Sequence, residues 1–515
     1  GRMMMLPGIR TYRPPFEPFV PGYDLDPASV PDAIATTVAR MNDGDTLTLT
    51  AGFVRRTIGD KTFVMYAFNR QSPGPAIRVD RDTEVVIDFR NEIDLPTTVH
   101  WHGLRLDNRF DGVPGVTQDL VRPGESFVYR LRFPDAGIYW YHPHHREDVQ
   151  QEMGLYGNML VDSPDSAYFA PVNREEFLIL DDLLLEGDHV SPFGLDGANF
   201  ALMGRFGDVM LLNGEHDYAL EVDRGEVVRF YVTNVANTRV FNFSFAGAPI
   251  KVVGGDIGKF EREVWTESIV ISPAERYVIE VRFDDPGSHA ITNRVQTIDH
   301  FMGEFASEVD TLGFVSVSES AVTPDHSAAF ADLRTNSDVI EDIDRFREHF
   351  TRAPDFELDL TIRVSDLPAG MIQFMGIDTT YYPPAEWTNS MPMMNWVSNT
   401  ANTHWILRDR ATGAENMNID WSARVGDVVK IRIWNDPKSF HPMSHPIHLH
   451  GQRFLLVERD GVPNPNMVWK ETILVPVGTT VDVLVDITNP GAWMLHCHIA
   501  EHLESGMMMT FRVDN

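Results

Sequence analysis

The chain has 515 residues, enough for about three domains of ordinary size, each with its own hydrophobic core. Hydrophobic residues make up 43% of it and charged residues 23%, and no run of about 18 apolar residues occurs, which excludes a disordered or membrane-spanning chain. A formal net charge of −32 excludes nucleic acid and anionic lipid as favoured partners.

The amino-terminal stretch, residues 1–44, is rich in proline, which predicts an extended arm rather than a folded domain. It has no apolar signal-peptide core, so no export signal is visible in it. Beyond it, short runs such as TLTLTAGFVRR, EVVIDFRNE and TVDVLVDIT alternate apolar with polar residues between Gly, Pro, Asp and Asn. These runs predict an all-β chain of sandwiches or barrels.

Two sequence templates each occur three times. The first is an acidic or glycine turn that leads into a valine-rich strand, and it occurs at 79–92, 222–235 and 423–436. The second is a pair of strands joined by a turn that ends in glycine, and it occurs at 122–142, 272–292 and 475–496. We therefore expect three related domains, at 45–165, 170–320 and 355–515, with a linker at 321–354.

Histidine distinguishes the outer copies from the middle one. Five residues after the turn glycine, the first and third copies have His142 and His496, whereas the second has Thr292. Earlier in each copy, VHWHGL and IHLHGQ correspond to FNFSFAG, which contains no histidine. The first and third domains are therefore expected to carry the chemistry, and the middle domain to supply no metal ligand.

Ten of the 19 histidines form four short clusters, which are His100/His102, His142/His144, His445/His448/His450 and His496/His498/His502. In a strand, residues i and i+2 point to the same face, so each His-x-His pair directs two imidazoles to one place. Four such pairs at a domain interface predict a nitrogen-rich site for copper, zinc or iron, and not for calcium or magnesium. Imidazole alone leaves zinc as a competitor of copper.

Cys497, the only cysteine, favours copper. It lies between His496 and His498, so it points to the opposite face of its strand. His502 follows five residues later and Met507 ten residues later, and another histidine, His445, comes from a separate cluster. Two histidines, a thiolate and a distant thioether are the ligand set of a blue-copper electron-transfer centre.

These motifs resemble those of the multicopper oxidases, in the laccase-like three-domain branch that includes bacterial-type laccases. HWHG (100–103), HPH (142–144), HPIHLHG (445–451) and HCHIAEHLESGM (496–507) stand in the family order. The resemblance implies three consecutive cupredoxin-like Greek-key β-barrel domains. It also implies four copper ions per chain, one of type 1, one of type 2 and two of type 3.

The resemblance further implies a role for every clustered histidine. The type 1 copper would be held by His445, Cys497, His502 and Met507, and the type 2 copper by His100 and His448. The paired type 3 coppers would take His102, His144 and His498 on one side and His142, His450 and His496 on the other.

The implied reaction is one-electron oxidation of a donor at the type 1 copper, through Cys497, and four-electron reduction of dioxygen to water at the other three coppers. With Met507 as the axial ligand, the expected donors are easily oxidised phenols and aromatic amines. Asp111 matches a family carboxylate that helps to deliver protons. Leu503 stands where bacterial relatives often have a glutamate, with Glu501 or Glu504 as substitutes.

The main alternative is a cuprous or other metal-ion oxidase for metal tolerance, suggested by the thioethers of Met371, Met375, Met391, Met393 and Met394. A copper store would be expected to have lost ligands, and a copper nitrite reductase would not need eight histidines beyond the type 1 site. The resemblance implies an extracytoplasmic location, periplasmic or secreted. We expect a monomer whose partners are a small-molecule donor and dioxygen, with no nucleic acid and no membrane span.

Overall fold

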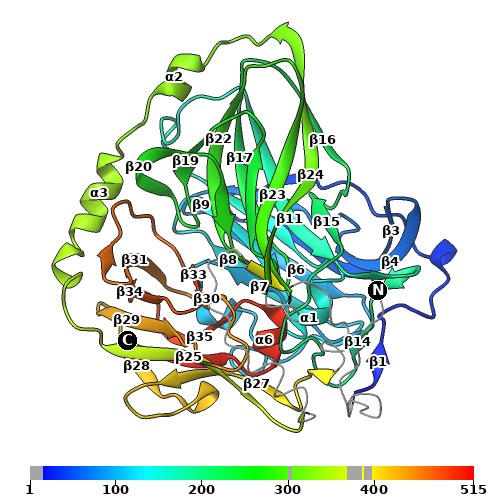
Figure 1. Cartoon of the computed structure of the whole chain (residues 1–515), viewed down its shortest axis with the longest axis vertical. Helices are drawn as coiled ribbons and strands as arrows, with labels where there is room; N and C mark the ends of the chain where they lie inside the picture. Colours follow the sequence, from blue (N-terminus) through cyan, green and yellow to red (C-terminus); the bar gives the residue numbers. More distant parts are fainter. Residues whose placement is uncertain (1–15, 300–303, 368–384, 388–396) are drawn as a thin grey trace.

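The structure is a computed structural model, and it describes residues 16–299, 304–367, 385–387 and 397–515. Most of the regular structure is β-strand, which confirms the predicted all-β class. The main strands form three pairs of sheets that follow one another along the chain, from the blue to the red part of Figure 1. No helix in the described part of the chain is long and apolar enough to cross a membrane.

The first sheet pair encloses a core in which Val85, Ile87 and Phe89 alternate with outward-facing residues of one strand. One sheet has the order β4-β3-β6-β8, with β3 (Thr46–Ile58), β4 (Lys61–Phe68), β6 (Glu84–Asn91) and β8 (Ser126–Arg132). The other has the order β2-β5-β10-β9-β7, with β2 (Val38–Arg40), β5 (Ala76–Asp80), β7 (His100–His102), β9 (Gly137–His142) and β10 (Gly157–Asp162).

The second sheet pair has two sheets of six described strands each and a separate core rich in Phe, Val and Ile. One sheet contains β11 (Arg174–Leu183), β15 (Val209–Leu212), β17 (Glu226–Asn234), β19 (Ile250–Gly254), β20 (Lys259–Thr266) and β22 (Arg276–Phe283). The other contains β16 (Tyr218–Arg224), β18 (Phe241–Phe245), β21 (Ile269–Ile271), β23 (Gly287–Asp299) and β24 (Glu304–Ala321), with β26 (Ala385–Trp387) beside β23.

The third sheet pair holds both the cysteine and the carboxy-terminal histidine clusters. One sheet contains β25 (Phe356–Val364), β27 (Thr403–Asp409), β29 (Val428–Asn435), β31 (Arg453–Arg459), β32 (Val462–Pro463) and β34 (Thr480–Asp486). The other has the order β28-β36-β35-β30-β33, with β28 (Trp421–Arg424), β30 (His445–Leu449), β33 (Thr472–Val475), β35 (Gly491–Cys497) and β36 (Met508–Asp514).

The repeated templates occupy equivalent strands of the three sheet pairs. The first template forms β6, β17 and β29, which pair in parallel with β3, β11 and β25. The second template forms β8 and β9, β22 and β23, and β34 and β35. The same pairing of equivalent strands therefore recurs three times, as the repeat predicts.

Short elements complete the fold. The helices α2 (Ser327–Ala331) and α3 (Ser337–Asp344) lie along the outside of the molecule between β24 and β25 (Figure 1). In the described part of the amino-terminal arm, β1 (Pro18–Phe19) pairs with β14 (Phe193–Gly194). Two further helices, α1 (Glu147–Gln150) and α6 (Ala500–Glu504), contact each other where the first and third sheet pairs meet.

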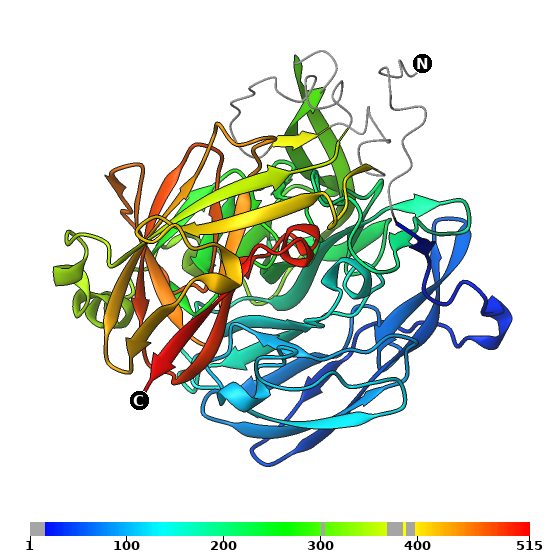
Figure 2. The same cartoon turned by 90° about the horizontal axis from the view of Figure 1, so that it is seen from below.

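The first and third sheet pairs lie side by side, blue beside red in Figure 2. Asn108 Nδ2 donates a hydrogen bond to the carbonyl oxygen of Ala492 at 2.7 Å, and Asn489 Nδ2 donates to that of Leu106 at 2.7 Å. These contacts place the strand ends that carry the His-x-His pairs opposite one another.

Candidate metal centre

The His-x-His pairs lie at equivalent strand ends in the two outer sheet pairs. In the first, β7 and β9 are antiparallel and His100 is directly opposite His142. In the third, β30 and β35 are antiparallel and His448 is opposite His496. Residues opposite each other in a sheet share a face, so each sheet pair directs its imidazoles to one side.

The eight imidazoles of the pairs are buried together between the two outer sheet pairs, and each is at most 8% exposed. Burial is the main cause that lowers the pKa of His102, His142, His448 and His450 well below the usual range, and that of His496 to about 4. These five imidazoles are therefore neutral at physiological pH, as metal ligands must be.

The outward nitrogens of these imidazoles are held by acceptors. His100 Nδ1 lies 2.7 Å from the carbonyl oxygen of Asp111, and His448 Nδ1 lies 3.0 Å from that of Glu471. His450 Nδ1 lies 2.8 Å from Oδ2 of Asp111. Carbonyl and carboxylate oxygens only accept, so Nδ1 carries the hydrogen and Nε2 is left as a free base.

Most of the inward nitrogens lack hydrogen-bond partners within the described residues, although Nε2 of His450 and Nε2 of His496 lie 3.0 Å apart. The unpaired nitrogens include Nε2 of His100, His142, His144 and His448 and both ring nitrogens of His498. His102 is turned over: its Nε2 lies 3.1 Å from Thr472 Oγ1 and its Nδ1 is unpaired. Buried polar atoms normally have partners, so a set of orphaned nitrogens that converge fits a bound metal.

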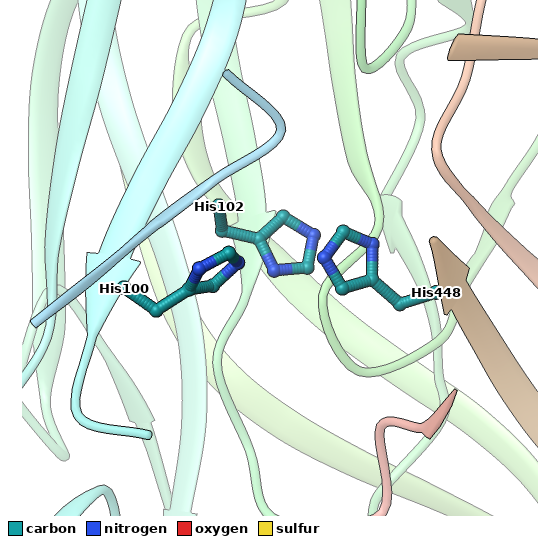
Figure 3. A group of neighbouring side chains, drawn as sticks. All are labelled: His100, His102 and His448. Carbon is teal, nitrogen blue, oxygen red and sulfur yellow. The ribbon is translucent and has the colours of Figure 1, made fainter. Parts of the chain in front are cut away.

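The ligand atoms gather into three overlapping groups, in each of which they lie within 4.8 Å of one another: His100/His102/His448, His102/His142/His498 and His144/His450/His496. Figure 3 shows the first group, with His448 pointing toward His100 and His102 from the opposite ribbon. The docking of the two outer sheet pairs exchanges His142 and His144 between the trios expected from the resemblance. His142 belongs with His102 and His498, and His144 with His450 and His496.

The cysteine group lies on the other face of the same strands. Cys497 Sγ is 3.5 Å from Nδ1 of His445 and 3.9 Å from Nδ1 of His502, and all three side chains are buried. Met507 is fully buried in the same core, and its carbonyl oxygen accepts the Cys497 backbone N–H at 3.1 Å. The Trp405 ring stacks on His502 with centroids 4.0 Å apart.

Burial determines the protonation of this group as well. It lowers the pKa of His445 to about 3 and raises the pKa of the Cys497 thiol. A buried thiol becomes a thiolate when a cation binds it, so the group suits a soft metal ion that displaces the proton. A cysteine, two imidazoles and a nearby thioether are the donors that select copper.

Asp111 holds both outer sheet pairs at the cluster. Its side chain is fully buried, its carbonyl oxygen binds His100, and its carboxylate binds His450 from the third sheet pair. It follows a single 3-10 turn at 108–110, for which Asp107 is the amino-terminal cap. One residue therefore fixes a ligand candidate from each side.

Glu147 is a carboxyl at the cluster that sequence reasoning missed. Its Oε1 lies 3.5 Å from Nδ1 of His144 and its Oε2 lies 3.9 Å from Nδ1 of His142. It is fully buried, both carboxyl oxygens lack a hydrogen-bond partner in the described structure, and burial raises its pKa well above the usual range. The only signal was its position three residues after His144, which becomes a contact because α1 begins there.

The carboxyls expected to substitute at the Leu503 position lie elsewhere. Glu501 accepts hydrogen bonds from Asn237 Nδ2 and Thr238 Oγ1, each at 3.0 Å. Glu504 Oε1 accepts the backbone N–H of Glu147 at 3.1 Å. Glu504 therefore reaches the cluster only through Glu147.

Sequence comparison agrees with this geometry. Family models described as multicopper oxidase match residues 53–166, 175–309 and 386–515, which together make up most of the chain. The chain belongs to the multicopper oxidase family. It is therefore a copper-dependent oxidoreductase that uses dioxygen and an electron donor, and its fold is a series of cupredoxin-like β-barrels.

Relatives of this multicopper oxidase differ in their named activities. A laccase of Arthroderma benhamiae is 27% identical, over 86% of this chain and 72% of its own. Multicopper oxidase MmcO of Mycobacterium tuberculosis is 27% identical, over 92% of this chain and 88% of its own. A solved multicopper oxidase of Campylobacter jejuni, described as a metallo-oxidase, superposes with a TM-score of 0.71 at 23% identity, over 98% of this chain and all of its own.

Proposed function

We propose that this multicopper oxidase is laccase-like. It couples one-electron oxidation of phenols or aromatic amines at a type 1 copper to four-electron reduction of dioxygen to water at a trinuclear copper cluster. One observation carries the proposal: Cys497 faces His445 and His502, while its chain neighbours His496 and His498 belong to the histidine groups on the opposite face. A single strand end therefore joins a donor-side group to an oxygen-side group.

The proposed ligands follow the groups in the structure. The type 1 copper is assigned to His445, Cys497 and His502, with Met507 added from the family resemblance. The type 2 copper is assigned to His100 and His448, from the group that also contains His102, and the two type 3 coppers to His102/His142/His498 and His144/His450/His496. When bound, four coppers supply one-electron acceptance from the donor and four-electron reduction of dioxygen.

The chain's own residues position these groups. Asp111 accepts a hydrogen bond from His450 and fixes its ring, so that Nε2 points inward. The Cys497 backbone links the thiol to His496 and His498 by covalent bonds, so the path between the two groups does not depend on a side-chain contact. We also assign Asp111 to proton delivery, as the family resemblance implies.

Replacement of Cys497 by Ser tests this proposal. The copper-loaded wild type is expected to show the strong blue absorption of a thiolate–copper bond and to consume oxygen with a phenol. The variant should lose both, because serine supplies no thiolate, and should retain copper in the histidine groups. A colourless copper-loaded wild type would contradict the proposal.

A metal-ion oxidase is the second candidate, favoured by the burial of the donor-side histidines. His445 is 1% exposed and His502 is fully buried, which restricts contact with a large organic donor. The five methionines that suggested this activity, at 371, 375, 391, 393 and 394, lie outside the described residues. Turnover of Cu(I) and of a phenol should be compared with and without added copper. If only the metal ion is oxidised at a useful rate, the protein is a metal-ion oxidase and the phenol assignment is wrong.

We further propose the domain limits 45–165, 170–320 and 355–515, with the arm at 1–44 and the linker at 321–354. The equivalent strands of the three sheet pairs support them. The proposed location is extracytoplasmic, as the family resemblance implies. The proposed state is a monomer, because one chain holds all the ligand candidates.

A further inference from the structure

A buried ion pair joins the middle sheet pair to the histidine cluster. Arg276, the first residue of β22, contacts Glu471, which directly precedes β33, through Nη1 to Oε1 and through Nη2 to Oε2, the latter at 3.1 Å. Both side chains are fully buried. Separating two charges in such a place is strongly unfavourable, so the pair holds each partner in one position.

Arg276 also contacts the first sheet pair. Its Nε donates a hydrogen bond to the carbonyl oxygen of Ile138, in β9, at 2.8 Å. Its backbone N–H donates to Asp256 Oδ1 at 2.8 Å, which fixes the start of β22. One guanidinium from the sheet pair without histidine ligands therefore contacts both sheet pairs that have them.

Glu471 carries this restraint to one ligand candidate. Its Oε1 lies 3.2 Å from Nε2 of His102, and Thr472 Oγ1 lies 3.1 Å from the same nitrogen. Thr472 Oγ1 donates its own hydrogen to Glu471 Oε1 at 3.4 Å, so its oxygen accepts from His102 Nε2. Nε2 therefore carries the hydrogen, and Nδ1 of His102 is the free base that faces the cluster. This is the reverse of the arrangement at His100, His448 and His450, whose Nδ1 atoms face outward.

The glycine of the HWHG motif makes room for the pair. A Cβ atom on Gly103 would lie 2.9 Å from Arg276 Nη2, 3.2 Å from Glu471 Oε2 and 2.8 Å from Cδ1 of Tyr139. Gly103 also has φ +93°, which other residues rarely adopt. The glycine next to His102 therefore leaves the space that the Arg276–Glu471 pair occupies.

We propose that Arg276 and Glu471 are positioning residues that set the ring orientation of His102, so that the middle sheet pair controls copper binding at the cluster although none of its described residues is a ligand candidate. The inference rests on the proposed function. Without Arg276, Glu471 loses its countercharge and its fixed position, and the His102 ring is free to turn Nε2 toward the cluster.

The test uses the 515-residue chain loaded with copper, and measures copper per chain together with the blue absorption. Arg276→Met should weaken copper binding at the histidine cluster about 10- to 100-fold while the blue absorption of the Cys497 group is retained. Arg276→Lys, which restores a positive charge beside Glu471, should recover part of the loss. The matched control is Arg229→Met, which breaks a buried pair with Glu280 of the same strand β22, away from the histidines.

Loss of folding is handled by a neutral double variant, Arg276→Met/Glu471→Met, which leaves no uncompensated charge. It should fold, show the blue absorption and lose copper from the cluster. Unchanged copper binding in this variant, or an equal loss in Arg229→Met, overturns the inference. A wild type that binds no copper at the cluster contradicts the proposed function instead.

The ring orientation is checked directly in the wild type. A crystal structure of the copper-loaded protein should show His102 directing Nδ1 to the metal and Nε2 to Glu471. Metal coordination by Nε2 of His102 would overturn the inference without any variant.

Discussion

The imidazole of His496 donates a hydrogen bond from Nδ1 to the carbonyl oxygen of Cys497 at 2.9 Å. This contact keeps Nε2 of His496 directed at the histidine groups while the Cys497 side chain points to the other face of β35. The hydrogen bond runs parallel to the covalent path between the two residues. The two proposed copper environments are therefore held at a fixed separation by a single stretch of backbone.

Asp111→Ala is expected to disconnect His450 from its acceptor. The copper affinity of the group that contains His450 should fall about 10- to 100-fold, and oxygen uptake with it, while the blue absorption is retained. Copper analysis and oxygen consumption measure this. Asp107→Ala is the control, because Asp107 is in the same loop but pairs with Arg109 at the surface; an equal effect there would assign the loss to the loop rather than to the carboxylate.

Trp405→Ala is expected to give organic donors better access to the proposed type 1 copper site. The Trp405 ring stacks on His502 and packs edge-to-face against His445, with the centroids of the Trp405 and His445 rings 4.8 Å apart. Its removal should speed reduction of the blue copper by a bulky phenol, followed as bleaching without oxygen. Trp405→Phe keeps an aromatic cover and should stay close to the wild type. Identical bleaching rates in all three proteins would show that the ring does not limit access.

Gly451→Ala is expected to destabilise the third sheet pair. Gly451 has φ +65°, and a Cβ atom there would lie 2.2 Å from Cε3 of Trp493. Gly44 has a similar φ of +82°, and a Cβ atom there would have no atom within 4 Å. The variant Gly44→Ala therefore isolates the cost of backbone strain, about 1–2 kcal/mol. Gly451→Ala should cost about 1–3 kcal/mol more, from overpacking, in chemical unfolding. Equal losses would mean that Trp493 moves aside freely.

Glu152→Gln is expected to change how stability depends on pH. Burial raises the pKa of Glu152 from 4.5 to about 7, against the opposing charge of Arg205. The folded protein therefore holds this proton more tightly than the unfolded chain. The stability it contributes is complete below pH 4.5 and is lost as pH rises to about 7.

The glutamine does not titrate, so the unfolding free energy of the variant relative to the wild type should rise by about 3 kcal/mol across that interval and stay level above it. Thermal unfolding of the metal-free proteins at several pH values measures this difference. A difference that is independent of pH would refute it.

The sequence predicted those features that depend on short-range rules. The alternation in runs such as 84–91 identified β6, and the i, i+2 rule placed both imidazoles of each His-x-His pair on one face. The same rule separated Cys497 from His496. The constant spacing after the turn glycines predicted equivalent strands, which the structure contains.

Features that depend on long-range packing were beyond that reasoning. The grouping of His142 with His102, rather than with His450, depends on how two sheet pairs dock and on ring rotation. Glu147 becomes a cluster residue because Arg146 adopts a left-handed conformation, with φ 44°, where α1 begins. Arg276 reads in the sequence only as the first residue of a buried strand, and its role depends on contacts with residues 138 and 471.

The proposed type 1 ligands all come from residues 445–507, whereas the histidine cluster needs residues from 100–144 as well. The proposed type 1 site therefore needs only the third sheet pair to be folded, whereas the histidine cluster also needs the first sheet pair to be docked against it. A molecule whose carboxy-terminal part has closed but whose amino-terminal part has not yet docked would be coloured and reducible, yet inert toward oxygen. Colour alone is thus a measure of one barrel, and oxygen consumption is a measure of the finished assembly.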